Sequence, residues 1–193
     1  LARLAPVFLC KAPGVSPAGE GVAGVTSEAF AGPHPAGLPG THIHFLDPVS
    51  TNKTVWTINY QDVIAAGKLF VSGQLSVERV VALAGPVVER PRLLRTRLGA
   101  NLSELTAGEL VPGNNRVVSG SLLGGRVARG ACDYLGRYHV QVSCLQEGND
   151  REVMHYLRAG VNKHSVMNIF VSKFNAAKRF AFSTSTNAVS YTH

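Results

Sequence analysis

The stretch that determines the architecture runs from Glu78 to Leu110 and reads ERVVALAGPVVERPRLLRTRLGANLSELTAGEL. Its first part carries two apolar, β-favouring runs, 78–88 and 92–99, which predict two strands, the first of them punctuated by a Gly-Pro pair. The residues that follow predict a short helix, because Asn101 suits the N-cap and Glu104, three residues later, completes a capping-box-like pattern.

A further strand is expected from 114–125, NNRVVSGSLLGG, which an Asn-Asn turn opens. Strand, strand, helix and strand in this order form a small α+β unit of the kind that a β-grasp makes, although periodicity alone leaves the strand order open. Beyond it, the alternation in YHVQVSCLQEG (138–148) predicts another strand. The segment 163–174 fits a helix or a strand, and 179–187 looks like a final strand.

The character of the sequence changes at about Ser76, and the residues before it follow a different pattern. The segment 5–10 reads as a short buried strand, and a loop rich in Gly, Pro and Ala follows it. Alternation in 41–49 favours a strand, and 54–59 is rich in β-favouring residues. The apolar residues of 60–70 lie near a common helical face, which predicts a helix.

Composition favours one large domain or two small ones with a sizeable core, because 45% of the 193 residues are hydrophobic. The formal net charge is +7, which favours acidic partners, nucleic acid or anionic lipid without choosing among them.

In the second predicted strand Arg95 and Arg97 would share one face. With Arg92 they form a candidate surface for an anion or a partner, although a solvated strand face explains them too. No aromatic residues interleave with them, which argues against nucleic-acid stacking.

The three cysteines, Cys10, Cys132 and Cys144, are widely spaced and include no Cys-x-x-Cys pair, so no zinc ribbon or thioredoxin-type site is indicated. Free thiols in a reducing compartment are the simple interpretation.

No apolar run approaches the ~20 residues that span a bilayer, and the opening segment lacks a secretory cleavage site. Because the sequence begins without Met and runs directly into a strand-like pattern, we expect an excerpt from a longer chain.

A literal Gly-x-Gly-x-x-Gly occurs at Gly19, Gly21 and Gly24, with Asp47 at a plausible distance. A dinucleotide site needs such glycines directly after a strand and at the start of a helix. Here a Pro-containing segment separates them from the predicted strand, and the next residues are too short and Pro-terminated for a good helix. The motif is therefore a weak indication of nucleotide binding.

Three histidines, His34, His42 and His44, lie in GPHPAGLPGTHIHFLDP (32–48). On a strand, His42 and His44 would point the same way as two metal ligands, with His34 as a third and Asp47 as a fourth. Neither a His-Glu-x-x-His helix nor a cysteine pair supports such a site, and histidines beside a Pro-rich turn often only hydrogen-bond the backbone. A stand-alone metal- or nucleotide-binding enzyme using these histidines or Gly19–Gly24 is the alternative function.

Several segments together resemble one family. In the same order, FAGPHPAGLPGTHIHFLDPV (30–49), INYQDVIAAGKLF (58–70), 79–110, RVVSGSLLGG (116–125) and YLGRYHVQVSCLQEG (134–148) resemble the A subunit of the bacterial Na+-translocating NADH:quinone oxidoreductase. The resemblance covers about 7–187 and is more specific than any single motif. The family's chain is longer, so this sequence is expected to be an internal fragment lacking both ends, and its last residues, 188–193, depart from the family's pattern.

The resemblance implies a fold and a division into parts. The family is related to the NADH-binding, flavin-carrying subunit of respiratory complex I and to its counterpart in the Rnf complex. It implies an α+β or α/β chain with part of a Rossmann-like domain at 1–77 and a soluble-ligand-binding β-grasp domain at 78–126. A β-rich extension is expected at 127–193. The second part coincides with the α+β unit that the strand and helix patterns predict.

The resemblance also implies a function. The whole complex transfers electrons from NADH to ubiquinone and couples this to Na+ export. Members of the family are peripheral proteins on the cytoplasmic face of the bacterial inner membrane, where they lie against a membrane-embedded partner. Their nucleotide and flavin motifs are degraded, so NADH, flavins and an iron–sulfur centre are expected on other subunits. No catalytic residue and no metal is expected on this chain, and ubiquinone is its candidate ligand.

The resemblance changes the interpretation of the histidine segment to a shaped Pro/Gly loop followed by a strand. Proline restricts φ and glycine permits tight turns, so such a loop holds one conformation. Its histidines brace the loop, face the partner subunit or lie near quinone, and the sequence does not separate these options. The residues expected to contact quinone or the partner are His34, Pro35, Gly37, Leu38, Gly40, His42 and His44.

Overall fold

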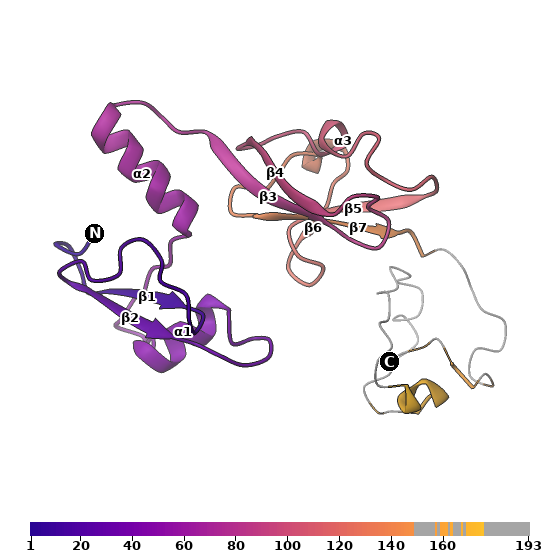
Figure 1. Ribbon diagram of the computed structural model, residues 1–193, viewed down its shortest axis with the longest axis horizontal. Helices are drawn as coiled ribbons and strands as arrows, with labels where there is room; N and C mark the ends of the chain where they lie inside the picture. The colour runs from indigo at the N-terminus through magenta and orange to yellow at the C-terminus, as the bar shows by residue number, and fades with distance from the viewer. Residues whose placement is uncertain (149–156, 158, 162, 164–166, 168, 176–193) are drawn as a thin grey trace. The chain divides into compact units, whose positions relative to one another are not determined.

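The chain divides into two compact units, Leu1–Val63 and Ile64–His193. The computed structural model describes residues 1–148, 157, 159–161, 163, 167 and 169–175. Figure 1 shows the elements of each unit along the chain. The mixed α/β character that the sequence predicts is confirmed, because both units combine strands with helices.

The second unit contains a five-stranded sheet in the order β4-β3-β7-β5-β6 (Figure 1). Its strands are β3 (Glu78–Ala84), β4 (Arg92–Arg97), β5 (Asn115–Ser119), β6 (Arg126–Val127) and β7 (Gln141–Gln146). Strand β3 pairs antiparallel with β4 and parallel with β7, while β5 pairs antiparallel with both β6 and β7. The sheet therefore extends beyond residue 126, and β7 lies at its centre.

The core of the described chain lies on one face of this sheet. Alternate residues of β3, Val81 and Leu83, are almost fully buried, as the period of two in a strand requires. They pack with Val142 and Cys144 of β7 and with further buried residues, namely Val88, Leu102 and Leu135. Burying each large aliphatic side chain contributes about 1.5–3 kcal/mol, so this cluster is the main source of stability within the described residues.

The helix α3 (Leu102–Leu105) forms where the sequence predicts it. Asn101 is its N-cap, and the Asn101 side-chain oxygen accepts a hydrogen bond from the Glu104 backbone N–H at 3.1 Å. This bond satisfies one of the amide groups that a helix start leaves without an intrahelical partner. The cap thereby positions Leu102, which is fully buried in the core.

One glycine of the second unit is required by close packing. Gly85 follows β3 with φ of +140°, and a Cβ at this position would collide with the Cys144 carbonyl and lie 2.8 Å from the Cys144 amide nitrogen. The end of β3 can therefore approach β7 only without a side chain. The Gly-Pro pair that punctuates the predicted strand thus marks the end of β3 and a backbone contact.

The first unit is built on a pair of parallel strands, β1 (Val7–Lys11) and β2 (Val25–Ala29), in register from Val7↔Val25 to Lys11↔Ala29. Helix α1 (Pro39–Leu46) follows them. Helix α2 (Tyr60–Ser72) begins in the first unit and ends in the second, and its apolar spacing predicts it. Neither helix contains a fully buried residue.

Three sequence predictions for the first unit are wrong. The segment 41–49 is not a strand, because 39–46 form α1 with Leu38 as N-cap and Pro39 in the first turn, where the fixed φ of proline suits a helix. The segment 54–59 has no regular structure. The loop predicted after the first strand is not continuous, because it contains β2.

The described residues also include two short 3-10 helices, η1 (Gly130–Cys132) and η3 (Val171–Phe174). The second of these lies at the end of the segment 163–174, for which helix and strand were both open. The predicted strand at 179–187 and the departure from the family's pattern at 188–193 lie outside the described residues.

Candidate functional site

The first candidate site is the segment 30–47 of the first unit, which we call the histidine loop. Its backbone folds back on itself before α1: the Pro33 carbonyl accepts from the Ala36 N–H at 2.9 Å, and the Pro35 carbonyl accepts from the Leu38 N–H at 2.9 Å. The Thr41 hydroxyl also donates to the Pro35 carbonyl, at 2.9 Å. Three prolines and these bonds hold the loop against the first turn of the helix.

The His42 side chain stabilises the conformation of this loop. Its Nε2 lies 2.9 Å from the Ala36 carbonyl, which can only accept, so Nε2 carries the proton and donates. The imidazole also packs on the Phe30 ring, with the ring centroids 4.3 Å apart. Of the three histidines that the sequence suggests could brace the loop, His42 is the one that does so, and its side chain is half-buried.

His34 and His44 lie at the surface instead. The His44 ring meets the Phe45 ring edge-on at a centroid distance of 5.1 Å, and Phe45 itself is 71% exposed. Leu38, the N-cap of α1, is 45% exposed. The remaining predicted contact residues, Pro35, Gly37 and Gly40, are exposed too, so the histidine loop presents apolar and imidazole groups to solvent.

The geometry does not support the metal interpretation of the histidines. Successive residues of a helix are ~100° apart, so His42 and His44 on α1 point to different sides, whereas the metal hypothesis needed them on one side of a strand. Across the part of the chain that the structure describes, no group of three or more His, Cys, Asp and Glu residues is placed to hold a metal ion. Asp47, the fourth ligand of that hypothesis, forms an ion pair with Lys53.

The glycine motif also lacks the geometry of a nucleotide site. Gly19, Gly21 and Gly24 all have positive φ and lie in turns, and the chain then enters β2 rather than a helix. A pyrophosphate cradle needs the N-terminus of a helix at this point. The glycines therefore serve the turns that connect two parallel strands.

The second candidate site is the basic strand β4, where the burial pattern confirms the predicted division of faces. Arg95 and Arg97 are exposed, while Leu94 and Thr96 are partly buried. Arg95 Nε lies 3.2 Å from a Glu78 carboxylate oxygen on the neighbouring strand. Arg97 therefore shares a face with Arg95, whereas Arg92, at an odd spacing from both, does not.

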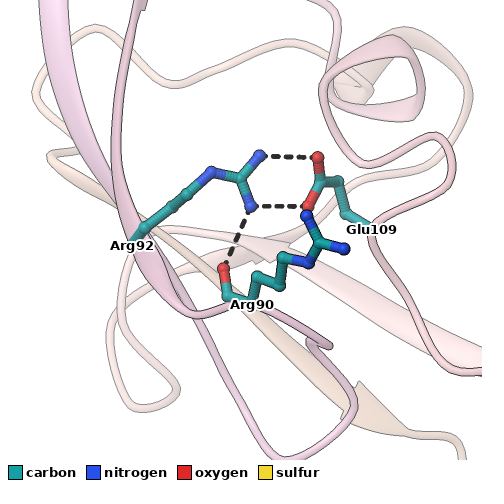
Figure 2. Close-up of polar contacts among 3 residues, drawn as sticks. All are labelled: Arg90, Arg92 and Glu109. Carbon is teal, nitrogen blue, oxygen red and sulfur yellow. Dashed lines mark hydrogen bonds and ion pairs between the residues drawn. The ribbon is translucent and has the colours of Figure 1, made fainter.

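Arg92 is already engaged by a carboxylate. Figure 2 shows its guanidinium facing the Glu109 carboxylate. Two N–H···O bonds of 2.6 Å join the two groups, and a third bond of 3.0 Å runs from Arg92 to the Arg90 carbonyl. The hydrogen bonds from Arg92 lower the pKa of Glu109, and its charge and that of Arg90 act in the same direction. The bidentate pair uses the fork of the guanidinium, so Arg92 stabilises the segment after α3 rather than offering itself to an anion.

A pocket of about 500 Å³ lies at the turn from β4 to α3. Its lining consists of Thr96, Arg97, Leu98, Gly99, Ala100, Asn101, Glu104 and Leu105. No sequence pattern indicates this pocket, although Arg97 is one of the residues predicted to bind an anion or a partner. Because Arg97 and Glu104 both line it, the pocket carries groups of both signs.

The fold also brings together Ser119 and His139, to which no sequence pattern assigns a role. Ser119 Oγ lies 2.7 Å from His139 Nδ1 and accepts from the Gly136 N–H at 2.9 Å. Burial lowers the pKa of His139, and the charge of Arg126 lowers it further. Because the Ser119 side chain is fully buried and already bonded, the pair ties β5 to the segment before β7 and does not present a nucleophile.

Among the described residues, no helix combines the length and the apolar character needed to cross a bilayer.

Comparison with known proteins identifies the family. A family model described as the NqrA second alpha/beta domain matches residues 1–75, and one described as the NQRA C-terminal domain matches residues 80–130. Proteins named as the A subunit of Na(+)-translocating NADH-quinone reductase are similar over almost the whole chain. The one from Pseudomonas aeruginosa strain UCBPP-PA14 is 72% identical, and the match covers 97% of this chain and 42% of the relative.

Two more distant relatives with the same name support this assignment. The protein of Cellvibrio japonicus is 63% identical over 97% of this chain and 42% of its own length. That of Neisseria gonorrhoeae strain FA 1090 is 54% identical over 94% of this chain and 40% of its own length. The chain thus spans about two fifths of the length of the relatives it matches. With this identity over almost its whole length and with both domain models matched, it belongs to the NqrA family, the A subunits of the Na+-translocating NADH-quinone reductase.

Proposed function

We propose that the chain is part of a subunit of a sodium-pumping respiratory enzyme, which transfers electrons from NADH to ubiquinone and couples this transfer to Na+ export. The observation that carries the proposal is the 72% identity, over 97% of the chain, with a protein named as the A subunit of such an enzyme. Three separate organisms supply relatives of that name.

The proposed role of this chain within the complex is docking, without a redox centre of its own. Its partners are the other subunits, chiefly a membrane-embedded one, and it lies on the cytoplasmic face of the bacterial inner membrane. NADH, flavins and the iron–sulfur centre are placed on those partners. Two structural observations support a non-catalytic role. The glycine motif leads into a strand rather than a helix, and the His42 side chain hydrogen-bonds the backbone of its own loop.

The histidine loop is the proposed contact for the quinone or the partner. Quinone-sized sites are mostly apolar, with a few polar groups that fix orientation. The exposed Leu38 and Phe45, beside His34 and His44, offer this combination, while His42 holds the loop in shape.

The finer fold assignment is part of the same proposal. We assign 1–77 to part of a Rossmann-like domain, which the parallel pair β1–β2 supports. We assign 78–126 to a β-grasp domain, supported by the antiparallel β3–β4 pair and by α3 between β4 and β5. The extension 127–193 then contributes β7 to the sheet of that domain.

Photo-crosslinking tests the quinone contact. A quinone analogue with an azido group is activated on the assembled enzyme containing this chain, and the labelled peptides are identified by mass spectrometry. The proposal expects label within 32–47, reduced by His44→Ala with His34→Ala and removed by excess ubiquinone. Label that never maps to this segment contradicts the contact. His139→Gln, a substitution in the other unit, is the matched control and leaves the labelling unchanged.

A pull-down tests the docking role separately. The tagged chain is mixed with detergent-solubilised membranes of a bacterium that contains the enzyme, and the retained proteins are identified by mass spectrometry. Retention of the other quinone-reductase subunits is expected. If the same subunits are retained by the full-length relative but not by this chain, the docking surface lies outside these residues. If neither retains them, the proposed assembly is wrong.

A further inference from the structure

Strand β4 is an edge of the five-stranded sheet, and its outer backbone groups can be identified from the register. The Leu98 N–H donates to the Val77 carbonyl at 2.8 Å, so these two residues form a directly bonded pair just beyond the β3–β4 ladder. In antiparallel pairs such bonded positions alternate along the strand. The N–H and C=O groups of Leu93, Arg95 and Arg97 therefore point away from β3, to the free edge.

These outward groups are largely unused in the part of the chain that the structure describes. The Arg97 carbonyl accepts from the Ala100 N–H at 3.2 Å. Leu93 and Arg95 have no backbone hydrogen bond on this edge within the described residues. An edge with open donors and acceptors is a template on which another strand can form a ladder.

The side chains of the same three residues form a row with one apolar and two basic positions. Leu93 is 72% exposed, the Arg95 side chain is 75% exposed, and Arg97 is exposed as well. The adjacent strand supplies one acid to this face, Glu78, which pairs with Arg95. Arg97 has no carboxylate partner among the described residues, so the row carries a net positive charge.

We propose that β4 is a docking edge for an extended acidic segment of a partner protein, which adds to the sheet as a further strand beside Leu93, Arg95 and Arg97. Residues of an added strand that face the same side recur every second position. The occupant therefore has an apolar residue opposite Leu93 and carboxylates opposite Arg95 and Arg97, each separated by one residue. Main-chain bonds supply affinity in this mode of recognition, and the alternate side chains supply specificity.

This proposal stands apart from the quinone contact, because the histidine loop and β4 belong to different units of the chain. Positive charge on an edge strand also has a plain explanation, since natural sheets use charged edge residues to prevent pairing with other chains. The two explanations differ in one measurable respect. Protection predicts no binding of any strand, whereas docking predicts binding that depends on the alternation of the partner's residues.

The test uses the purified chain and two synthetic peptides labelled with a fluorophore. The first alternates one Val and two Glu with Thr at the intervening positions, and the second has the same composition with the Val and Glu moved onto opposite faces. Fluorescence anisotropy measures their dissociation constants at low and at physiological salt. The alternating peptide is expected to bind at least tenfold more tightly, and its binding should weaken as salt screens the arginines.

Two sets of variants locate the binding. Arg95→Glu with Arg97→Glu is expected to weaken binding by about tenfold or more, since two favourable charge contacts become repulsive. Arg3→Glu with Arg129→Glu, at two exposed arginines outside β4, is the control for the same change in net charge. Arg95→Pro removes an outward N–H without removing a bond to β3, so it should bind more weakly than Arg95→Ala, which has the same charge.

Circular dichroism and thermal unfolding show whether each variant retains its fold, and only folded variants are compared. Equal binding of both peptides means a general electrostatic contact and overturns the proposal, as does undiminished binding by Arg95→Glu with Arg97→Glu. No binding of either peptide means that the arginines only protect the edge. Binding of nucleic acid or of anionic vesicles in place of the alternating peptide would also overturn it.

Discussion

The two units of the chain differ in how they are held together. No residue of 1–63 is fully buried, and that unit relies on the β1–β2 ladder and on local hydrogen bonds such as those of the histidine loop. The second unit has a buried cluster shared by β3, β7 and α3. Because hydrophobic burial is the dominant favourable term in folding, we expect the stability of the chain to reside in the second unit. The loop proposed to contact the quinone or the partner and the buried core that supplies stability thus lie in different parts of the sequence.

The largest test of this comparison places the same substitution in both units. Leu83→Ala removes a side chain that is 1% exposed and should lower the free energy of unfolding by about 2–5 kcal/mol. Leu38→Ala, at a side chain that is 45% exposed, should change it by less than about 0.5 kcal/mol. Urea unfolding followed by circular dichroism measures both. Equal losses would show that the first unit contributes as much stability as the second.

A glycine substitution tests the closest backbone approach in the second unit. Gly85→Ala forces β3 away from β7 and places a side chain at a strained φ, so a loss of about 2–4 kcal/mol is expected from overpacking and strain. Gly67→Ala, in the interior of α2 with open space around it, should instead stabilise by about 0.5–1 kcal/mol. Thermal unfolding of the two variants measures the difference, and opposite signs are the decisive result.

A smaller effect is expected at the helix cap. Asn101→Ala removes the bond to the Glu104 N–H and should lower stability by about 1 kcal/mol. Asn101→Asp keeps an acceptor in the same place and should retain most of the stability. If the alanine and aspartate variants unfold at the same urea concentration, the cap contributes nothing measurable to the second unit.

The smallest effect is a dependence on pH. The folded state holds the pKa of His139 below its ordinary value of 6.5, so the unfolded chain binds the proton more readily. Above about pH 6.5, His139 is neutral in both states and does not affect the free energy of unfolding. As the pH falls from there towards the lowered folded pKa, protonation of the unfolded chain lowers the free energy of unfolding. Unfolding in urea between about pH 8 and pH 5 should show this slope, and His139→Gln should flatten it. An unchanged slope in His139→Gln would assign the dependence to other groups.

Most strands of the second unit and α3 could be predicted because their signals are local, whereas the two-residue β6 and the 3-10 helix η1 were not predicted. The alternation in β3, β4 and β7 and the spacing from Asn101 to Glu104 are visible over a few residues. In the histidine segment the same alternation misled, since His42, Ile43 and Leu46 also share a helical face and Pro39 starts a helix. A short window does not distinguish these periods when both are satisfied.

Contacts between distant residues could not be read from the sequence. Arg92 and Glu109 are 17 residues apart, and Ser119 and His139 are 20 apart, so no spacing rule connects them. The place of β7 between β3 and β5 depends on pairing across the whole unit, which is why the strand order stayed open. Of the predicted contact residues, the structure separates His42, which is engaged within the loop, from His34 and His44, which are exposed.

The position of β7 also has a consequence for synthesis on the ribosome. The β3–β4 hairpin can form as soon as Arg97 has emerged, but β3 pairs with β7 only after Gln141 is made, because Ala82 lies opposite Gln141. Until then Val81 and Leu83 have no β7 against which to bury. Pairings between residues so distant in sequence close slowly and leave partly formed sheets prone to aggregation. The nascent chain therefore passes through a stage in which a strand of its core is translated but uncovered, and chaperones that bind nascent chains are expected to act there.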